Sequence, residues 1–580
     1  MSFDQVKALL ERSIALSLQT LFPELDTSLP VVLESPKEAS HGDLACTSAM
    51  GLAKILKQNP RQIADKIKHS LQANTELMAY LDRIEVAGAG FMNVTFKPIV
   101  WHAVGQTILG LKDRFGYASA NQQCVIVEFV SANPTGPLHV GHARQAALGD
   151  AIASLYQTQG YQVIREFYYN DAGQQIENLA LSVQARARGI LPDSPQFPAD
   201  GYRGEYIESI AQAYLNKDTV SGDKVSTVAA LGDINDIEAI RAFAVAYLRR
   251  EQELDLAAFG LSFDVYSLES ALYTSGKVDQ VVQALTKANL TYEQDGALWL
   301  RTSEFGDDKD RVMRKADGAY TYFVPDLAYH LDKKRRCDWA VNVQGMDHHG
   351  TIARVRAGLQ GLAGEKAQQA FVMDGATITI PDQWPQYVLH KMVTVMRDGV
   401  EVKISKRAGS YVTLRDLIDW AGRDAVRFFL SSRKADTEFV FDVNLAQEQS
   451  ENNPVFYVQY AHARICAVID QAKQRGIIGD EVEIASANWQ FLVEPEALSL
   501  LRWMNQYPTT LSFACEQLSP HLIAFFVRDL AQKLHSFYNA HRVLVDDKEL
   551  CLARLALLLS VRQVIANGLS LLGVSAPNKM

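Results

Sequence analysis

The stretch VIVEFVSANPTGPLHVGHARQAALGDAIASLYQTQGYQVIREFYY, residues 125–169, sets the fold of the central part of the chain. It begins with an apolar run over 125–130, typical of a buried strand, and a loop rich in Pro, Gly and Asn follows. Helical spacing of apolar residues predicts a helix over 140–159, and a second strand is predicted over 163–168. Strand, helix and strand in this order form a right-handed parallel crossover, so we predict an α/β domain with a Rossmann-like parallel sheet.

Patterns outside this stretch divide the 580 residues into several units. The apolar segments AVNVQG (340–345) and YVLHKMVTVM (387–396) are predicted to add strands to the sheet. Near the N-terminus, helical patterns precede the alternating IEVAGAGFMNVTF, and near the C-terminus apolar positions recur at three- and four-residue spacing. We predict a small α+β module over 1–97, a linker over 98–120, the parallel-sheet domain over 121–395 with a helical insertion at about 177–258, a connecting region over 396–452 and an all-α bundle over 453–580.

The charge distribution limits how the chain can bind nucleic acid. Its 57 basic and 67 acidic side chains give a net charge of −10, which argues against coating nucleic acid through bulk positive charge. The ends are nearly neutral, with 10 basic against 11 acidic residues over 1–97 and 11 against 13 over 446–580. A nucleic-acid partner would need local basic patches. KKRR (333–336) is one candidate, although such runs are more often solvated turns.

Cysteine spacing and hydropathy exclude further classes. The 6 cysteines are isolated from one another, without the two-residue spacing of zinc ribbons or redox motifs, so no structural zinc is expected. The N-terminal MSFDQVKALLERSIALSLQTLF is amphipathic and contains acids, unlike a signal peptide, and no run of about 18 apolar residues occurs. We therefore expect a cytoplasmic protein without a membrane partner.

The segment PTGPLHVGHAR (134–144) predicts a phosphate site. It places His139 and His142 between a strand end and a helix start, where free backbone N–H groups and the helix dipole favour an anion. Two imidazoles at this spacing share a helix face and can donate to phosphate oxygens, with His142 better placed to follow the developing charge. Gly141 lets a flat ring or a phosphate approach the backbone. The natural ligand is a nucleotide.

A second candidate element is KISKR (403–407), followed by a glycine at 409. Three cations and a hydroxyl beside a glycine can close over a triphosphate, although such a loop alone would more often be a solvated basic turn. Between the two elements, QGMDHHG (344–350) follows an apolar strand. It places Asp347 where a carboxylate can accept hydrogen bonds from ribose hydroxyls.

The pair HVGH and KISKR resembles the two signature motifs of class I aminoacyl-tRNA synthetases, and its context resembles the arginyl-tRNA synthetases. Ile404 stands where the common second motif has Met, an apolar exchange of similar size. The likeness covers nearly the whole chain. The segments that carry it are EFVSANPTGPLHVGHAR (128–144), FDVYSLES (263–270), YTYFVPDLAYHLDK (320–333), QGMDHHG (344–350), KISKRAGSYVTLRDL (403–417), GRDAVRFFL (422–430) and NPVFYVQYAHARI (453–465).

This resemblance implies a two-step ligation. The carboxylate of L-arginine attacks the α-phosphorus of ATP, which arrives with Mg²⁺, and a terminal adenosine hydroxyl of tRNA then takes the arginyl group. It further implies that residues 1–97 contact the outer corner of tRNA, that 396–452 carries the signature loop and contacts the tRNA stem, that 453–580 binds the anticodon, and that the protein is a monomer. Candidate bundle contacts are Tyr460, Arg464, Arg528, His535, Tyr538 and Arg542.

Site residues follow from the same resemblance. A guanidinium has five donors and a permanent charge, so its pocket should offer carboxylates and an aromatic face. The implied catalytic residues are His139, His142, Lys403 and Lys406. The implied ATP-binding residues are Pro134, Leu138, His139, Gly141, His142, Gly345, Asp347, His348, Lys403, Ser405 and Lys406. The implied arginine-binding residues are Ser131, Asn133, Glu269, Tyr322, Asp326 and Gln344, with Glu128 either in the pocket or in a salt bridge.

Three alternatives compete with this interpretation. A small-molecule nucleotidyltransferase explains the HVGH segment but neither the helical C-terminal region nor KISKR. A synthetase for cysteine lacks the expected zinc-type cysteine sets, whereas a pocket of acids and a tyrosine leaves lysine physically possible as the substrate. A non-catalytic tRNA-binding paralogue is disfavoured because both histidines and both lysines of the two motifs are present.

Overall fold

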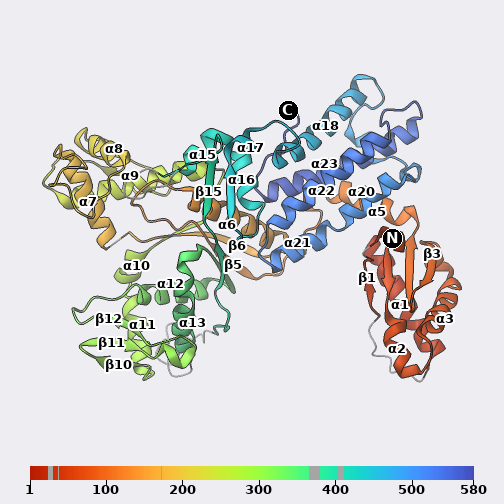
Figure 1. The fold of residues 1–580 in the computed structure, drawn as a ribbon, viewed down its shortest axis with the longest axis horizontal. Helices are drawn as coiled ribbons and strands as arrows, with labels where there is room; N and C mark the ends of the chain where they lie inside the picture. The colour runs from red at the N-terminus through yellow and green to blue at the C-terminus, as the bar shows by residue number, and fades with distance from the viewer. Residues whose placement is uncertain (24–30, 37, 172, 365–378, 403–410) are drawn as a thin grey trace.

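The computed structural model describes residues 1–580 except 24–30, 37, 172, 365–378 and 403–410. Figure 1 shows an elongated molecule with a parallel sheet near its centre. The N-terminal module and the helical bundle lie on one side of that sheet, and two further lobes lie on the other. Within the described ranges, no helix has both the length and the apolar character needed to cross a membrane.

The central sheet has five strands, all paired in parallel, in the spatial order β14-β13-β5-β6-β9. The chain builds outward from β5 in one direction and then returns to add β13 and β14 on the other side. Ligands bind at the carboxyl edge of such a sheet, where the strand order reverses. The parallel pairing of all five strands confirms the predicted α/β fold class. The strands are β5 (Cys124–Glu128), β6 (Gln162–Tyr169), β9 (Val265–Leu268), β13 (Trp339–Gly345) and β14 (Gln386–His390).

The predicted crossover helix is α6 (Val140–Thr158), which connects β5 to β6. Two fully buried arginines hold it in place. Arg144, within α6, donates to the backbone carbonyl of Lys391 at 2.9 Å. Arg427, on a helix that packs against α6, pairs with Asp150 of α6. The start of α6 is thereby fixed relative to the sheet and to the region after it.

The prediction that the whole segment YVLHKMVTVM adds to the central sheet is wrong for its second half. Its first half is β14 of the central sheet, but its second half, β15 (Val393–Arg397), leaves that sheet. There it pairs in parallel with β17 (Phe439–Asp442) and antiparallel with β16 (Val400–Glu401). At the break, the Lys391 amide donates to the Ala435 carbonyl instead of continuing the central ladder. An apolar pattern cannot reveal such a change of partner.

Two insertions form the lobes beyond the sheet. The first contains the predicted helices at 177–258 and buries its own apolar cluster. The second, between β9 and β14, adds a three-stranded antiparallel sheet that the sequence analysis did not predict. The first lobe comprises α7 (Gln174–Ala187), α8 (Glu205–Leu215), β7 (Thr219–Val220), β8 (Val228–Ala229) and α9 (Ile237–Ala258). The second comprises α10 (Glu269–Thr274), α11 (Lys277–Lys287), β10 (Thr291–Gln294), β11 (Ala297–Leu300), β12 (Arg311–Arg314), α12 (Phe323–Arg336) and α13 (His349–Ala363).

The N-terminal module packs helices on a four-stranded sheet of order β1-β2-β4-β3. The predicted linker contains α5 (Pro98–Leu111), whose buried face packs against the bundle, so this connection is largely a packed helix. The elements of the module are α1 (Phe3–Leu21), β1 (Leu33–Glu34), β2 (Leu44–Cys46), α2 (Ser48–Leu56), α3 (Pro60–Gln72), α4 (Thr75–Met78), β3 (Leu81–Ala87) and β4 (Phe91–Phe96).

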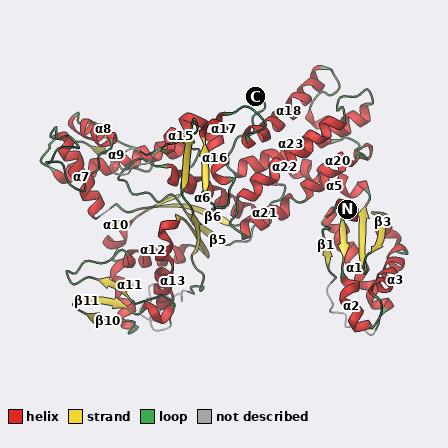
Figure 2. Cartoon of the chain, in the orientation of Figure 1, coloured by secondary structure: helices red, strands yellow, loops and turns green. Residues whose placement is uncertain are grey.

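The C-terminal region is a bundle of helices, as predicted (Figure 2). Its buried residues form one hydrophobic cluster with those of the N-terminal module and of α6, so removing the bundle would expose the core of the other units. The connecting region contributes α15 (Leu414–Ala421), α16 (Arg423–Ser431) and α17 (Val443–Gln447). The bundle contributes α18 (Pro454–Gln474), α19 (Glu481–Ala485), α20 (Pro495–Asn505), α21 (Tyr507–Glu516), α22 (His521–Ala540) and α23 (Lys548–Leu571).

Candidate active site

A cavity of about 740 Å³ opens at the carboxyl ends of β5, β13 and β14. It is bounded by the N-terminus of α6 and by the first inserted lobe, whose Tyr206 hydroxyl donates to the Thr135 carbonyl at 2.8 Å. The structure therefore brings most of the predicted nucleotide residues to one place. Those that line the cavity are His139, Gly141, His142, Gly345, Asp347 and His348, and two residues predicted to bind arginine, Ser131 and Asn133, line it as well.

The two histidines of HVGH form a stacked pair at the head of α6. Their ring centroids are 3.7 Å apart and their planes differ by 19°. His139 is the N-cap residue, and its Nδ1 accepts from the Gly141 amide at 3.1 Å. The Nδ1 of His142 accepts from the His139 amide at 3.2 Å. Since Nδ1 is an acceptor in both, each neutral ring carries its proton on Nε2, which makes Nε2–H the donor.

Gly141 is required by the conformation of His139. A Cβ at position 141 would lie 2.9 Å from Cε1 and 3.0 Å from Nδ1 of His139, closer than side chains tolerate. The space that the missing side chain leaves is thus used by the imidazole of His139, and the approach of a ligand ring or phosphate to this backbone stays a prediction. This capping leaves the first turn of α6, with its dipole, facing the same cavity.

Two of the predicted nucleotide residues lie outside this lining. Pro134 and Leu138 are buried. The Leu138 carbonyl accepts from the Leu414 amide at 2.7 Å, and the Val140 amide donates to the Val412 carbonyl at 3.0 Å. These bonds join the HVGH segment to the chain that follows the second motif.

Lys403, Ser405 and Lys406 of the second motif lie outside the described residues. The chain that follows them is described, and Tyr411 lines the cavity, with its ring 6.0 Å from that of His139. Position 411 is therefore adjacent to the phosphate-type donors of α6.

Three carboxylates, those of Asp326, Glu269 and Glu128, lie near the carboxyl end of β5. Burial and the neighbouring charges of Glu269 and Glu128 raise the pKa of Asp326 to about 7. Burial also raises the pKa of Glu269, whose Oε2 accepts from the Tyr168 hydroxyl at 3.0 Å. Raised pKa values in a cluster of acids mean that a cation entering there would be bound favourably.

The other residues predicted to bind arginine differ in their exposure and in their hydrogen-bond partners. Tyr322, at the start of α12, is 67% exposed. Ser131 donates to Glu128 at 2.8 Å, and Asn133 donates to Gln175 at 2.7 Å. Gln344, at the end of β13, has a buried Oε1 with no hydrogen-bond partner among the described residues. That atom is an acceptor for which a donor is missing.

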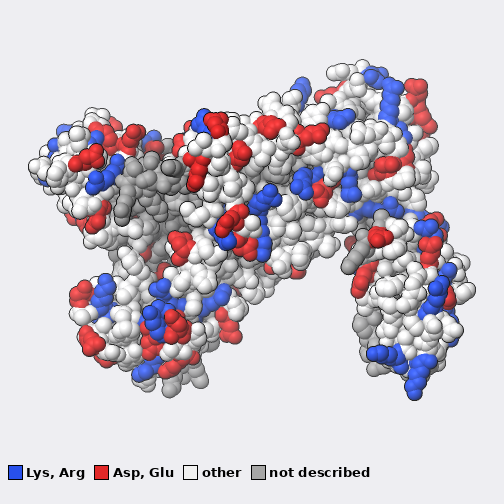
Figure 3. Space-filling view, viewed as in Figure 1, with Lys and Arg blue, Asp and Glu red and all other residues white. Residues whose placement is uncertain are grey.

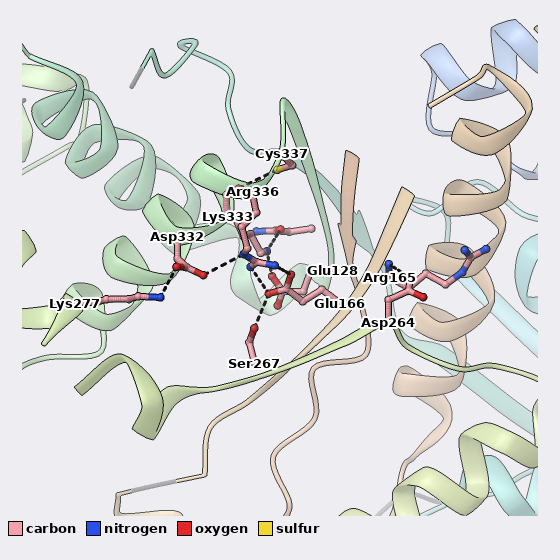
Figure 4. A network of polar contacts seen from close by, with 11 residues as sticks. Glu128, Arg165, Glu166, Asp264, Ser267, Lys277, Asp332, Lys333, Arg336 and Cys337 are labelled. Atoms are coloured by element: carbon pink, nitrogen blue, oxygen red, sulfur yellow. Dashed lines mark hydrogen bonds and ion pairs between the residues drawn. The ribbon is translucent and has the colours of Figure 1, made fainter. Parts of the chain in front are cut away.

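Glu128 has a fixed cationic partner, which also corrects the KKRR prediction (Figure 4). Lys333 is fully buried, and its ammonium group contacts Glu128 and the side-chain oxygen of Asn342, the latter at 2.9 Å. Arg336 makes a two-pronged contact with buried Glu166 at 2.8 and 2.9 Å. Half of the proposed basic patch therefore points into the protein, because α12 turns these side chains toward the acids of the sheet.

His390 is a site residue that the sequence analysis missed. It lines the cavity at the end of β14 yet is only 4% exposed. A single histidine at the end of a strand, between Leu389 and Lys391, carries no motif signal, and only the strand pairing that brings it beside Gly345 indicates a role.

A parallel sheet whose first crossover helix begins with the HVGH pair, facing a nucleotide-sized cavity, defines a class I aminoacyl-tRNA synthetase. Three family models match the chain: the catalytic domain of class I (R) tRNA synthetases over residues 105–469, the arginyl tRNA synthetase N-terminal domain over 8–96, and the DALR anticodon binding domain over 458–580. The chain belongs to the arginyl-tRNA synthetase family.

Individual relatives agree with the family models. The chain is 57% identical to the arginine–tRNA ligase of Bordetella petrii over 558 residues, which cover 96% of both chains. It is 55% identical to that of Bordetella pertussis over 583 aligned positions, which cover 100% of both. The solved arginyl-tRNA synthetase of Thermus thermophilus has the same fold, with a TM-score of 0.71 at 20% identity, covering 99% of this chain and 100% of that one.

Proposed function

We propose that this chain ligates L-arginine to its tRNA, using the cavity at the head of α6 for ATP and the acidic cluster beside it for the arginine side chain. The observation that carries the proposal is the juxtaposition itself. Imidazole donors preset for phosphate and carboxylates preset for a cation share the carboxyl edge of one sheet. That pairing suits a reaction between a triphosphate and a cationic amino acid.

In the first step, a carboxylate oxygen of arginine attacks the α-phosphorus of ATP, and the bond to pyrophosphate breaks. No protein nucleophile is needed, because the substrate carboxylate is already ionised at neutral pH. Catalysis is then orientation and charge stabilisation, for which the Nε2–H groups of His139 and His142 are suited. Lys403 and Lys406 neutralise the outer phosphates, a role supported by the position of Tyr411, and Mg²⁺ enters with ATP.

In the second step, a terminal ribose hydroxyl of tRNA attacks the arginyl carbonyl, and AMP leaves. The lining of the cavity includes Tyr202 and Arg203 from the first inserted lobe. A guanidinium and an aromatic ring are suited to phosphate contact and base stacking, respectively. We assign the 3′ end of tRNA to this side of the cavity.

The bundle offers a surface suited to unpaired bases. Tyr460 is 42% exposed and stacks with Phe456 and with His535 at centroid distances of 6.1 and 6.4 Å. The Arg464 guanidinium lies 4.4 Å from the Tyr538 ring centroid. Aromatic and arginine planes of this kind bind splayed nucleotides. The match to the DALR anticodon binding domain over 458–580 supports assigning the anticodon to this surface.

The N-terminal module is assigned to the outer corner of tRNA on the family match over 8–96. On the face drawn in Figure 3, Lys and Arg are interspersed with Asp and Glu over both this module and the bundle. Binding by local contacts rather than by the net field is therefore the expected mode. We propose that the protein works as a cytoplasmic monomer.

Arginine-dependent exchange of pyrophosphate into ATP, run with and without tRNA, tests the proposal. We expect exchange with arginine and tRNA together and none with lysine, because a compact ammonium cannot pair two carboxylates in the forked geometry of a guanidinium. Exchange supported by lysine would overturn the choice of substrate. Exchange supported by neither amino acid would overturn the proposed reaction.

The KM for arginine should rise as the pH falls from 8 to 6. Asp326 has a pKa of about 7, so below that pH it becomes protonated and loses its attraction for the guanidinium, which stays charged. The same raised pKa stabilises the free protein at low pH, and this contribution is lost as the pH rises through 7. Steady-state kinetics at several pH values measure the trend. An Asp326→Asn variant serves as the control, because it should lack this part of the pH dependence.

A further inference from the structure

His390 combines deep burial with an unused acceptor. Its Nδ1 lies 3.0 Å from the Lys391 carbonyl, and a carbonyl can only accept, so the ring proton sits on Nδ1. Nε2 is therefore an acceptor. It is buried and has no hydrogen-bond partner in the part of the chain that the structure describes. Burial lowers the pKa of this histidine to about 4, which keeps Nε2 unprotonated at neutral pH.

The position of His390 ties this acceptor to the cavity. The residue lines the cavity and pairs in register with Gly345, the last residue of β13. A Cβ built on Gly345 would lie 2.4 Å from Oδ1 of Asp347 and 4.0 Å from Nε2 of His390, so the absence of a side chain there lets the Asp347 carboxylate, predicted to accept from ribose hydroxyls, lie near this second acceptor. An unpaired buried acceptor is destabilising, and native proteins usually satisfy such groups.

The chemistry of the acceptor selects the part of ATP that it can recognise. Phosphate oxygens are acceptors and cannot satisfy an unprotonated Nε2, whereas a ribose hydroxyl and the exocyclic amine of adenine are donors. The phosphate-type donors of the cavity stand on a different element, at the head of α6. The edge formed by β13 and β14 is thus left for the nucleoside.

We propose that His390 is a nucleoside-recognition residue, whose Nε2 accepts a hydrogen bond from a ribose hydroxyl or from the exocyclic amine of ATP. The inference rests on the proposed function in taking ATP as the occupant of the cavity. It assigns to the end of β14 a specificity that the two signature motifs, which supply donors and cations, do not provide.

Three variants separate this role from packing. His390→Phe removes the acceptor and keeps a ring of similar size, and the Lys391 carbonyl remains paired because it also accepts from Arg144 at 2.9 Å. His390→Asn retains a donor near the position of Nδ1 but has no atom near that of Nε2. His390→Gln places an amide oxygen near the position of Nε2. In the exchange assay with arginine and tRNA, we expect roughly tenfold higher ATP KM for Phe and Asn, and recovery of most of that loss for Gln.

ATP analogues identify the donor. Each of three analogues lacks one candidate donor. The 2′-hydroxyl is missing from 2′-deoxy-ATP, the 3′-hydroxyl from 3′-deoxy-ATP, and the exocyclic amine from purine riboside triphosphate. One analogue should raise the KM of the wild-type chain roughly tenfold and have no further effect in His390→Asn, because both changes remove the same hydrogen bond. Equal analogue penalties in the two proteins would overturn the proposal, as would an unchanged ATP KM in both Phe and Asn variants. A merely structural role for His390 would not produce such selectivity among analogues.

His102→Phe is the matched control. His102 is 5% exposed, bonds to the Leu492 carbonyl at 2.7 Å and lies on α5, so its loss tests the general effect of removing a buried histidine. Its ATP KM should stay at the wild-type value, and a rise equal to that of His390→Phe would overturn the assignment. Lack of exchange by the wild-type chain would instead refute the proposed reaction. Direct titration of ATP into the wild-type chain and His390→Asn would then decide the role of His390, with equal affinities counting against it.

Discussion

Replacing His142 by Ala should lower kcat for arginine-dependent pyrophosphate exchange by about 10²–10³-fold, the loss typical of one preorganised donor at a developing charge. The Nδ1 of His142 already accepts from the His139 amide, so the ring carries its proton on Nε2, and stacking on His139 fixes its plane. A donor held in this way stabilises charge on the phosphate as pyrophosphate leaves, without reorganising first. The effect should appear in kcat more than in the KM for ATP, because the interaction strengthens in the transition state.

His142→Asn distinguishes the donor from the helix cap. An Asn oxygen can accept from the His139 amide in place of Nδ1, but the side chain is too short to offer a donor at the position of Nε2. We expect Asn to restore thermal stability lost in the Ala variant and to leave kcat low. Recovery of kcat by Asn, or an Ala variant with nearly wild-type kcat, would show that His142 acts only by capping α6.

The catalytic crossover was predictable because its signals are local. The strand, the turn residues and the helix follow one another within residues 125–169, and each carries its own periodicity. The HVGH spacing predicted the shared face of His139 and His142, and the structure confirms that they are adjacent. What spacing could not reveal is that the two rings accept from the backbone of α6, because this depends on the rotamers of both histidines.

Features that depend on distant partners escaped the sequence analysis. Lys333 belongs to a basic run, yet it is buried because α12 places it against Glu128 and Asn342, which lie on different strands. The break after β14 has the same origin. Its cause is the competition between the central sheet and β17, about fifty residues later in the chain, and no local pattern encodes that choice.

Asp326→Asn should raise the KM for arginine on the order of 10²–10³-fold, since truncating one partner of a buried charge pair costs about 2–5 kcal/mol. Asn has the size of Asp but cannot supply the charge that a guanidinium requires. Because Glu269 and Glu128 already repel the ionised Asp326, the substitution relieves that repulsion in the free protein. We therefore expect the free energy of unfolding at pH 8 to rise while arginine recognition is lost.

That opposite response separates recognition from folding. A residue needed only for the fold would lose stability and activity together, and it would weaken arginine and ATP equally. Asp332→Asn is the matched control, because it removes a carboxylate from the same helix that pairs with Lys277 and Arg336 instead of facing the acidic cluster. Its KM for arginine should stay near the wild-type value. Equal increases in the arginine and ATP KM of Asp326→Asn would remove Asp326 from the pocket and leave Glu269, held by Tyr168, as the principal anion for the substrate.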